Sequence, residues 1–399
     1  MKNLGFRWLF KGLVFIPGIL FIMCSCHSYN DKKLQKEIDL IAARFVPDRR
    51  VGICNVKLEA GEKGILILKG ETTSPEAKNE IIKTLYNPGK TLIDSIINLP
   101  DTAVNKKSFG LVTLSVINLR KEPDHTSELV AQARLGTPVL ILKSKNSWVQ
   151  IQTPDNYISW TEASSVKLLN KMEMDVWKDS ERVIYMDNSG WLHDNPSDNS
   201  GVDGDLVGGC IMKKTGELKG YFSVELPDGR TGFVERHKVM NFNDWKLVTP
   251  CTEESICSVA KTFLGLPYLW GGSSAKAVDC SGFVQSVYFM NGLILQRDAS
   301  QQALHGSIVD ISNGYSQLEK GDLLFFGLKV NGKQRVTHVA IYLGNMEYIN
   351  SSGRVMINSL DSTQTNFNRK RTNSLLSAKR IIGVENDPGI VPVFKHSWY

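Results

Sequence analysis

A glycine-rich stretch that runs into an apolar segment constrains this chain most. Positions 267–274 read Pro-Tyr-Leu-Trp-Gly-Gly-Ser-Ser, and five residues later comes Cys280-Ser281-Gly282-Phe283. Apolar side chains from Gly282 to Asn291 follow helical spacing, so we predict a helix that begins close to Cys280. A thiol at a helix N-terminus faces unpaired N–H groups and the positive end of the helix dipole, which both favour the thiolate. We therefore expect Cys280 to be an ionised thiol.

Size and charge set the class of protein. The chain has 399 residues, too many for one small core, and its 42% hydrophobic and 22% charged content is typical of a soluble globular protein. The formal net charge is +6. Because no basic run is interleaved with aromatic residues, we expect no nucleic-acid partner.

The N-terminus is predicted to be a targeting segment. Lys2, Arg7 and Lys11 precede an apolar run from residue 13 to residue 23 that is too short for a comfortable membrane span. We read residues 1–25 as a signal peptide. The sequence Met-Cys-Ser-Cys that ends at Cys26 resembles a bacterial lipobox, which implies lipidation of Cys26 and a membrane-anchored lipoprotein of the cell envelope. A plain signal peptide and an uncleaved anchor are the alternatives.

The cysteine count leaves at least one thiol unpaired. Five cysteines follow position 26, at positions 54, 210, 251, 257 and 280, and an odd number in an exported protein cannot pair completely. Cys280 is the expected free thiol. Pairing of Cys251 with Cys257 stays open. No cluster of Cys and His has zinc spacing, so we expect no metal and no cofactor.

Periodicity divides the chain into several domains. Residues 31–105 are predicted to be a small α/β domain similar to BON-type modules. Residues 108–168 contain short apolar runs separated by turn signals, an arrangement that resembles a bacterial SH3-type β-barrel. Residues 170–248 repeat that pattern with insertions, which predicts a second SH3-type barrel. Residues 251–399 place helices before strands, which predicts an α+β domain around Cys280.

His338 and Asn350 are the expected partners of the thiol. A thiolate needs a base, and the base needs a group that orients it. Strand alternation puts His338 on one face with Ala340 and Tyr342, and we expect the Cys280 helix to meet that face. Asn350 begins a polar run after an apolar pair, where its amide can bond one ring nitrogen and leave the other for Cys280. The order Cys, His, Asn is that of papain-like enzymes.

Five motifs in order then carry a family resemblance. They are Tyr-Leu-Trp-Gly-Gly at 268–272, Asp-Cys-Ser-Gly-Phe at 279–283, Arg297-Asp298, Gly-Asp-Leu-Leu-Phe-Phe at 321–326, and Thr-His-Val-Ala-Ile-Tyr-Leu-Gly at 337–344. Together they resemble NlpC-type papain-like cell-wall cysteine peptidases over residues 253–385. The domain set is also similar to that of the γ-D-glutamyl-L-diamino acid endopeptidases. The fold class is therefore a multidomain chain: a small α/β unit, two SH3-type β-barrels and an α+β papain-like peptidase domain.

The resemblance implies a role for each motif residue. Cys280 is the nucleophile and His338 the general base and then acid. The third polar residue, often His in the family, falls on Asn350. Tyr268 places its hydroxyl near the thiol, where it and the Cys280 N–H stabilise the oxyanion.

The implied substrate is the peptidoglycan stem peptide, cut after γ-D-Glu, with a free N-terminal L-Ala. An ammonium group in a pocket needs a carboxylate, and Asp279 and Asp298 are the first choices. Ser281 is expected to contact the substrate, and Glu122 and Tyr157 of the first barrel to close the pocket. The expected partners are muropeptides and a membrane, and the protein is expected to be a monomer. Alternative readings are a wall-binding lipoprotein with an inactive papain-like domain, and an amidase or acyltransferase.

Overall fold

The computed structural model describes residues 20–102, 104–248, 251–384 and 386–399, and only the backbone of residues 20–30, 63, 105 and 248. Most of the predicted signal peptide and the side chain of Cys26 therefore lie outside the described residues. Within the described residues, no helix combines the length and the apolar character needed to cross a membrane. The chain divides into two compact units, with the boundary between Asn98 and Leu99.

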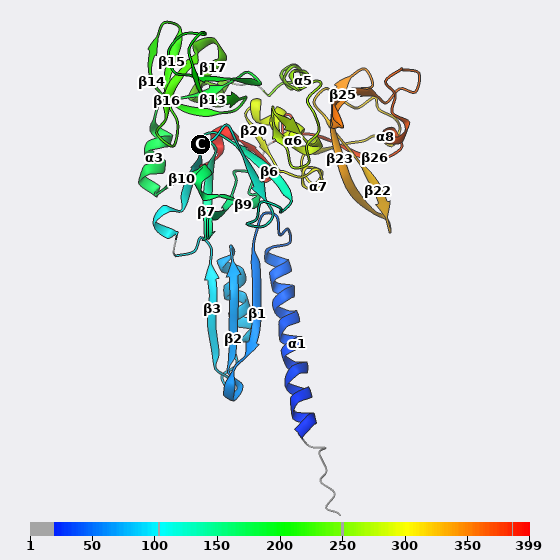
Figure 1. Ribbon diagram of the computed structural model, residues 1–399. Coiled ribbons are helices and arrows are strands. Elements are labelled where there is room, and N and C mark those ends of the chain that lie inside the picture. The colour runs from blue at the N-terminus through cyan, green and yellow to red at the C-terminus, as the bar shows by residue number, and fades with distance from the viewer. Residues whose placement is uncertain (1–19, 103, 249–250, 385) are drawn as a thin grey trace, which may run out of the picture. The chain divides into compact units, whose positions relative to one another are not determined.

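The first unit pairs two helices with a three-stranded sheet (Figure 1). Its elements are α1 (Leu20–Phe45), β1 (Cys54–Ala60), β2 (Leu66–Thr72), α2 (Pro75–Leu85) and β3 (Leu92–Asn98). β1 and β2 are antiparallel, whereas β2 and β3 run parallel with α2 between them. Ser74 caps α2 by accepting the N–H of Ala77, and Pro75 occupies the first turn, where its missing N–H is not needed. The buried core includes Ile38, Leu68 and Ile81.

The second unit begins with a seven-stranded sheet, here called the first sheet. Its strands are β4 (Phe109–Val112), β5 (Val116–Arg120), β6 (Leu129–Arg134), β7 (Pro138–Lys145), β8 (Trp148–Gln152), β9 (Ile158–Glu162) and β10 (Val166–Leu169). They lie in the order β10-β4-β7-β8-β9-β5-β6. Alternating side chains of these strands build one buried core. Among the described strands no pairing joins β6 to β10, so closure into a barrel is not seen.

A second seven-stranded sheet follows, here called the second sheet. Its strands are β11 (Arg182–Tyr185), β12 (Ser189–His193), β13 (Val202–Val207), β14 (Ile211–Leu218), β15 (Tyr221–Glu225), β16 (Thr231–Glu235) and β17 (Val239–Asn241). Their order is β13-β12-β16-β15-β14-β11-β17, and read from the other end it is that of the first sheet with each strand replaced by the one seven places later in the chain. The sequence pattern, in which residues 170–248 repeat residues 108–168, predicts that the two sheets share one strand order. The helices α3 (Lys171–Asp179) and α4 (Phe242–Val248) flank the sheet in the sequence and were not predicted.

The last part of the chain is α+β, as the order of its patterns indicated. Its helices are α5 (Glu253–Thr262), α6 (Cys280–Met290), α7 (Ala299–Gln302) and α8 (Arg369–Thr372). The main sheet contains β21 (Ser307–Val309), β22 (Leu323–Val330), β23 (Lys333–Gly344), β24 (Glu347–Ser352), β25 (Arg354–Ser359) and β26 (Leu375–Arg380). The strand order is β21-β26-β22-β23-β24-β25, and every pair is antiparallel. Four short strands make two small ladders, β18 (Ser273–Ser274) with β19 (Ala277–Val278) and β20 (Leu293–Leu295) with β27 (Ile390–Pro392).

The apolar helix α6 is the centre of this part (Figure 1). Ten of its eleven residues are buried, which is why its sequence is apolar on nearly every side. Phe283, Val284 and Val287 pack against Val339 and Ile341 of β23. The helix therefore covers one face of the main sheet.

The cysteines of the described region are all free thiols. Cys54, Cys210, Cys257 and Cys280 are buried, and Cys251 is partly exposed. Cys251 and Cys257, whose pairing the sequence left open, are therefore not joined by a disulfide. Cys280 is one of five free thiols and not a single leftover.

Close backbone packing fixes where α6 begins. A Cβ atom added at Gly282 would lie 2.1 Å from the carbonyl oxygen of Gly272. Gly271 has a φ of +80°, a conformation that glycine adopts without strain. The two glycines of the loop and the glycine of the helix are thus parts of one contact between loop and helix.

We predict that Gly282→Ala destabilises the second unit by about 1–3 kcal/mol, because the contact with the Gly272 carbonyl forces backbone to move. The helix propensity of alanine offsets at most about 1 kcal/mol of this loss. Urea denaturation measures the free energy of unfolding. Gly216→Ala is the matched control, since the nearest atom to a Cβ there is 3.7 Å away. Equal stability of the two variants would contradict the prediction.

Candidate active site

The N-terminus of α6 is held by the side chain of Asp279. Its Oδ1 accepts the N–H of Gly282 at 2.7 Å, and its Oδ2 accepts the N–H of Gly271 at 3.0 Å. Asp279 is thus the N-cap of the helix and also ties the glycine-rich loop to it. Cys280 is the first residue of the helix, as predicted, and its side chain is buried.

A buried ion pair completes this arrangement. Arg297 donates from Nη2 to Oδ2 of Asp279 at 2.6 Å and from Nη1 to Oδ1 at 3.1 Å. Arg297 is 1% exposed, and although burial opposes its charge, Asp279 raises the pKa of Arg297. Ser281 joins the network, because its Oγ accepts Nη1 of Arg297 at 3.0 Å and donates to Asp279. The Asp279 carboxylate is therefore surrounded by donors of its own chain.

The thiol of Cys280 meets β23 beside His338. The backbone N–H of Val339, in the peptide that follows His338, lies near enough to the sulfur to oppose the rise in the pKa of the thiol. The expectation that α6 packs on the strand face of His338, Ala340 and Tyr342 is wrong. The helix packs on the opposite face, which carries Val339 and Ile341, because those side chains are the more apolar set.

A β-bulge lies directly before His338. Phe326 of β22 pairs with His338, but the next residue, Gly327, pairs with Val336, so Thr337 is an extra residue in β23. A bulge bends its strand and changes the direction in which nearby side chains leave it. Simple alternation therefore does not describe this part of the strand.

His338 is oriented by Asn350 of β24. The distance from His338 Nε2 to Asn350 Oδ1 is 2.9 Å. The amide nitrogen of Asn350 donates to Asn358 Oδ1 at 3.0 Å and to the Met356 carbonyl at 3.3 Å, so the oxygen must face the ring. Nε2 therefore carries the proton, and Nδ1 keeps a free lone pair.

Burial sets the charge of both groups. It raises the pKa of the Cys280 thiol to about 11, and the nearby Asp279 adds to this rise. It also lowers the pKa of His338 to about 3, helped by the charge of Arg371. Burial thus favours the neutral thiol, against the expectation of an ionised one, because desolvation opposes the effect of the N–H groups at the helix start.

Tyr268 lies in the same electrostatic environment. Burial raises the pKa of its hydroxyl to about 12, and Cys280 and Asp279 act in the same direction. The N–H of Tyr268 donates to the Gly353 carbonyl at 2.9 Å, which ties the loop to the turn after β24. The hydroxyl is therefore a protonated donor close to the thiol.

The two site residues predicted from the first sheet, Tyr157 and Glu122, differ in where they lie. Tyr157 is buried and lies close enough to Arg297 to act on its charge. Glu122 is exposed; its backbone N–H donates to Ser127 and its carbonyl accepts the N–H of Asp124, and among the described residues no hydrogen bond links its carboxylate to the thiol. The carboxylate that reaches the glycine-rich loop is Glu128, whose Oε1 accepts Trp270 Nε1 at 3.0 Å.

Asp298 caps α7. It forms a capping box with Gln301, and its N–H donates to Gln301 Oε1 at 3.1 Å. The helix ends at Gln302. Gln302 then turns back to the site and donates to the Ser281 carbonyl at 3.2 Å.

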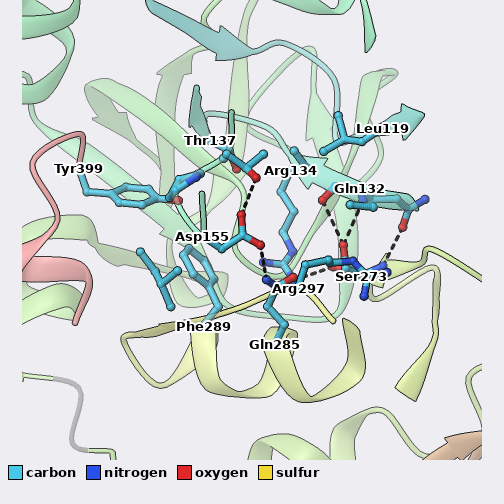
Figure 2. Close-up of a pocket in the computed structure, with 15 residues that line it drawn as sticks. Leu119, Gln132, Arg134, Thr137, Asp155, Ser273, Gln285, Phe289, Arg297 and Tyr399 are labelled. Atoms are coloured by element: carbon cyan, nitrogen blue, oxygen red, sulfur yellow. Dashed lines mark hydrogen bonds between the residues drawn. The ribbon is translucent and has the colours of Figure 1, made fainter. Parts of the chain in front are cut away.

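A small cavity lies on the other side of α6, between the helix and the first sheet. Figure 2 shows Asp155 and Arg134 of the sheet region pointing toward Gln285 of α6 and toward Ser273. Gln285 donates to Asp155 at 2.7 Å, and Arg134 donates to the Ser273 carbonyl at 2.8 Å. The cavity measures about 70 Å³, and neither Cys280 nor His338 lines it. It belongs to the joint between the sheet and the helix.

Several residues of the site were not predicted. Arg297 was noticed only as part of a motif, and its pairing with Asp279 needs tertiary contact. Asn358 supports Asn350 from β25, and its position on the buried edge of a hairpin gives no special sequence signal. Glu128 stands six residues from the expected Glu122, and only the placement of Trp270 distinguishes the two.

Two family models match the chain. The NlpC/P60 family matches residues 265–375, and the bacterial SH3 domain matches residues 115–167. The first match contains the thiol, the histidine and the asparagine described above. The second match lies within the first sheet, from the start of β5 to β10.

Curated relatives agree with these matches. A γ-D-glutamyl-L-lysine dipeptidyl-peptidase of Bacillus cereus is 28% identical over 235 residues, which are 57% of this chain and 68% of the relative. A probable endopeptidase, an NlpC homologue of Haemophilus influenzae, is 31% identical over 148 residues, which are 36% of this chain and 72% of the relative.

A solved structure shares the fold. The crystal structure of an NlpC/P60 family protein from Bacillus cereus aligns with a TM-score of 0.60 at 22% identity, and it covers 69% of this chain and 100% of that chain. The family matches and the relatives together show that the chain is a hydrolase of the NlpC/P60 family that also carries a bacterial SH3 domain.

Proposed function

We propose that this chain is a cysteine peptidase that hydrolyses the bond between γ-D-Glu and the diamino acid of peptidoglycan stem peptides. The contact of 2.9 Å between His338 and Asn350 carries the proposal, because it leaves Nδ1 of the ring as a free base, and the Cys280 thiol lies near the peptide that follows this histidine. The relative from Bacillus cereus is named for a γ-D-glutamyl-L-lysine dipeptidyl-peptidase activity, which supports the bond that is cut.

The reaction starts from a neutral pair. When the substrate carbonyl approaches, the Cys280 proton passes to Nδ1 of His338 and the sulfur attacks the carbonyl carbon of γ-D-Glu. His338 then gives this proton to the leaving amine as the C–N bond breaks, which leaves a thioester on Cys280. A water molecule, deprotonated by His338, attacks the thioester, and the proton returns to the sulfur as the product acid leaves.

The oxyanion is stabilised by donors that need no rearrangement. Tyr268 keeps its proton at neutral pH because the pKa of its hydroxyl is about 12. The backbone N–H of Cys280 opens the helix, where such groups have no partner within the helix. Two fixed donors of this kind contribute several kcal/mol of transition-state stabilisation, on the order of 3 kcal/mol each.

The acyl part of the substrate is assigned to the side of α6 that faces the first sheet. Ser281, Asp298 and Tyr157 are the proposed contacts, and a free N-terminal L-Ala ammonium is assigned to Asp298. Asp279 is assigned to holding Arg297 and the helix cap, since its oxygens already accept from Gly271, Gly282 and Arg297. The participation of Glu122 stays a prediction from the family resemblance.

The remaining proposals concern the whole chain. We assign it to the cell envelope as an exported lipoprotein anchored through Cys26, acting as a monomer on muropeptides. The division into a signal peptide and four domains stays a proposal, and so does closure of the two sheets into SH3-type barrels. The shared strand order of the first and second sheets supports the second SH3-type domain.

Replacement of the nucleophile tests the reaction. We predict that Cys280→Ala abolishes release of L-Ala-D-Glu from free stem tripeptide, because no thioester can form. Product release is read by mass spectrometry, with Cys257→Ala as the control for loss of another buried thiol. Release of the dipeptide at the wild-type rate by Cys280→Ala would end the nucleophile assignment.

Acetylation of the substrate amine tests the free-amine preference. We predict a fall in kcat/KM of roughly ten- to a hundredfold, since a charge-assisted contact worth about 1.5–3 kcal/mol is lost. The measurement compares acetylated and free tripeptide at equal concentration. Unchanged turnover would point instead to cleavage within the intact wall.

The pH dependence of alkylation tests the neutral pair. With the thiol pKa raised to about 11, the thiolate is scarce at pH 7, so the rate of iodoacetamide attack on Cys280 should rise continuously from pH 6 to pH 10. Mass spectrometry of the modified peptide separates Cys280 from the other thiols. A rate that is already constant below pH 7 would show a preformed thiolate and contradict the expectation.

A further inference from the structure

A half-buried cation stands beside the catalytic groups and takes no part in the steps above. Arg371 belongs to the short helix α8, and its Nη2 is 3.4 Å from Ser352 Oγ. Its guanidinium lies over the ring of Phe326, 5.7 Å from the ring centre. Over the ranges that the structure covers, no carboxylate is recorded within ion-pair distance of this side chain.

Arg371 is close to the reacting atoms. The ring of Phe326 that it covers has its centre 5.8 Å from that of His338. Its charge is the second cause, after burial, of the low pKa of His338. Burial lowers the pKa of Arg371 itself, while Tyr348, Cys280 and Tyr268 support its charge. A cation that has lost part of its water and has no anion beside it is costly, so a site that keeps one is suited to an anion that arrives with the substrate.

Arg371 and Arg297 lie on different sides of the site. Arg297 is paired with Asp279 and lies toward the first sheet, on the side assigned to the acyl part of the substrate. Arg371 contacts Ser352, two residues after Asn350 on β24, and so lies on the side of the imidazole. The leaving amine must be next to the imidazole to receive its proton. The residue that leaves is therefore the part of the substrate nearest Arg371.

We propose that Arg371 binds a carboxylate of the diamino acid that leaves, and so selects stem peptides whose third residue carries a free acid. The proposal rests on the proposed function, because it assigns the leaving side of that reaction. Two carboxylates have this chemistry: the main-chain carboxylate of a tripeptide that ends at the third residue, and the side-chain carboxylate of diaminopimelate. A guanidinium donates two parallel hydrogen bonds to either one.

The test compares acid and amide substrates. The first pair is L-Ala-γ-D-Glu-L-Lys and its C-terminal carboxamide, and the second is the diaminopimelate tripeptide with and without an amidated side-chain carboxyl group. Arg371→Gln should lower kcat/KM on the acid by roughly ten- to a hundredfold and on the matching amide by less than about threefold. Loss in the first pair assigns the main-chain carboxylate, and loss in the second pair alone assigns the side-chain carboxylate.

Matched variants separate recognition from general damage. Arg369→Gln removes an exposed arginine of the same helix and should leave both members of each pair unchanged. Arg371→Lys keeps the charge without the planar fork and should restore part of the preference for the acid. Equal losses on acid and amide would overturn the proposal, because they would show that Arg371 acts only through His338 or through folding.

A binding measurement keeps the proposal separate from the catalytic one. In the Cys280→Ala background, calorimetry gives the Kd of the acid and amide tripeptides without turnover. The acid should bind at least about tenfold more tightly than the amide, and Arg371→Gln should remove that difference. Equal binding of both by the Cys280→Ala protein overturns the assignment of Arg371. Absence of cleavage by the wild type, with the difference in binding intact, would instead overturn the proposed reaction.

Discussion

The buried pair of Arg297 and Asp279 is the interaction on which the site depends. One carboxylate caps α6, holds the glycine-rich loop and pairs with a guanidinium that is almost without exposure. Removal of either partner would leave a charge in a region without water, at a cost of about 3–5 kcal/mol. The position of the sulfur therefore follows from a polar network behind it and not from the thiol's own contacts.

Burial explains how the thiol and the imidazole can stay neutral and unreactive until a substrate binds. A thiol and an imidazole that are both neutral attract each other weakly, and neither is paired with an opposite charge that would be lost when substrate enters. In the proposed mechanism the proton moves only when a carbonyl is present to become an oxyanion, and Tyr268 and the dipole of α6 then offset the cost of charge separation. In an enzyme whose resting thiol and imidazole already form an ion pair, the cost of charge separation falls before the substrate binds.

Local patterns predicted much of this structure, and tertiary contacts decided the rest. The helix at Cys280, the strands around His338 and Asn350, and the antiparallel character of the last sheet follow from periodicity that is visible in the chain. The face on which α6 packs differs from the expected one, because the more apolar side chains of Val339 and Ile341 form the core with the helix. The burial that favours a neutral Cys280 could not be predicted from the sequence, because the depth of burial is a property of the assembled domain. Glu122 and Glu128 are equivalent by pattern, and only the position of Trp270 separates them.

The joint between the first sheet and α6 has a consequence for how this chain can change over evolutionary time. Arg134 donates to Ser286 and to the Ser273 carbonyl, and Asp155 accepts from Gln285, so the contacts of the sheet end on the helix that carries the proposed nucleophile. A domain attached in this way cannot simply be replaced by another, because the replacement would have to bring matching polar groups to that helix. The second sheet is also tied to this helix, because Ile184 and Ile211 share a buried core with Phe289 and Met290 of α6.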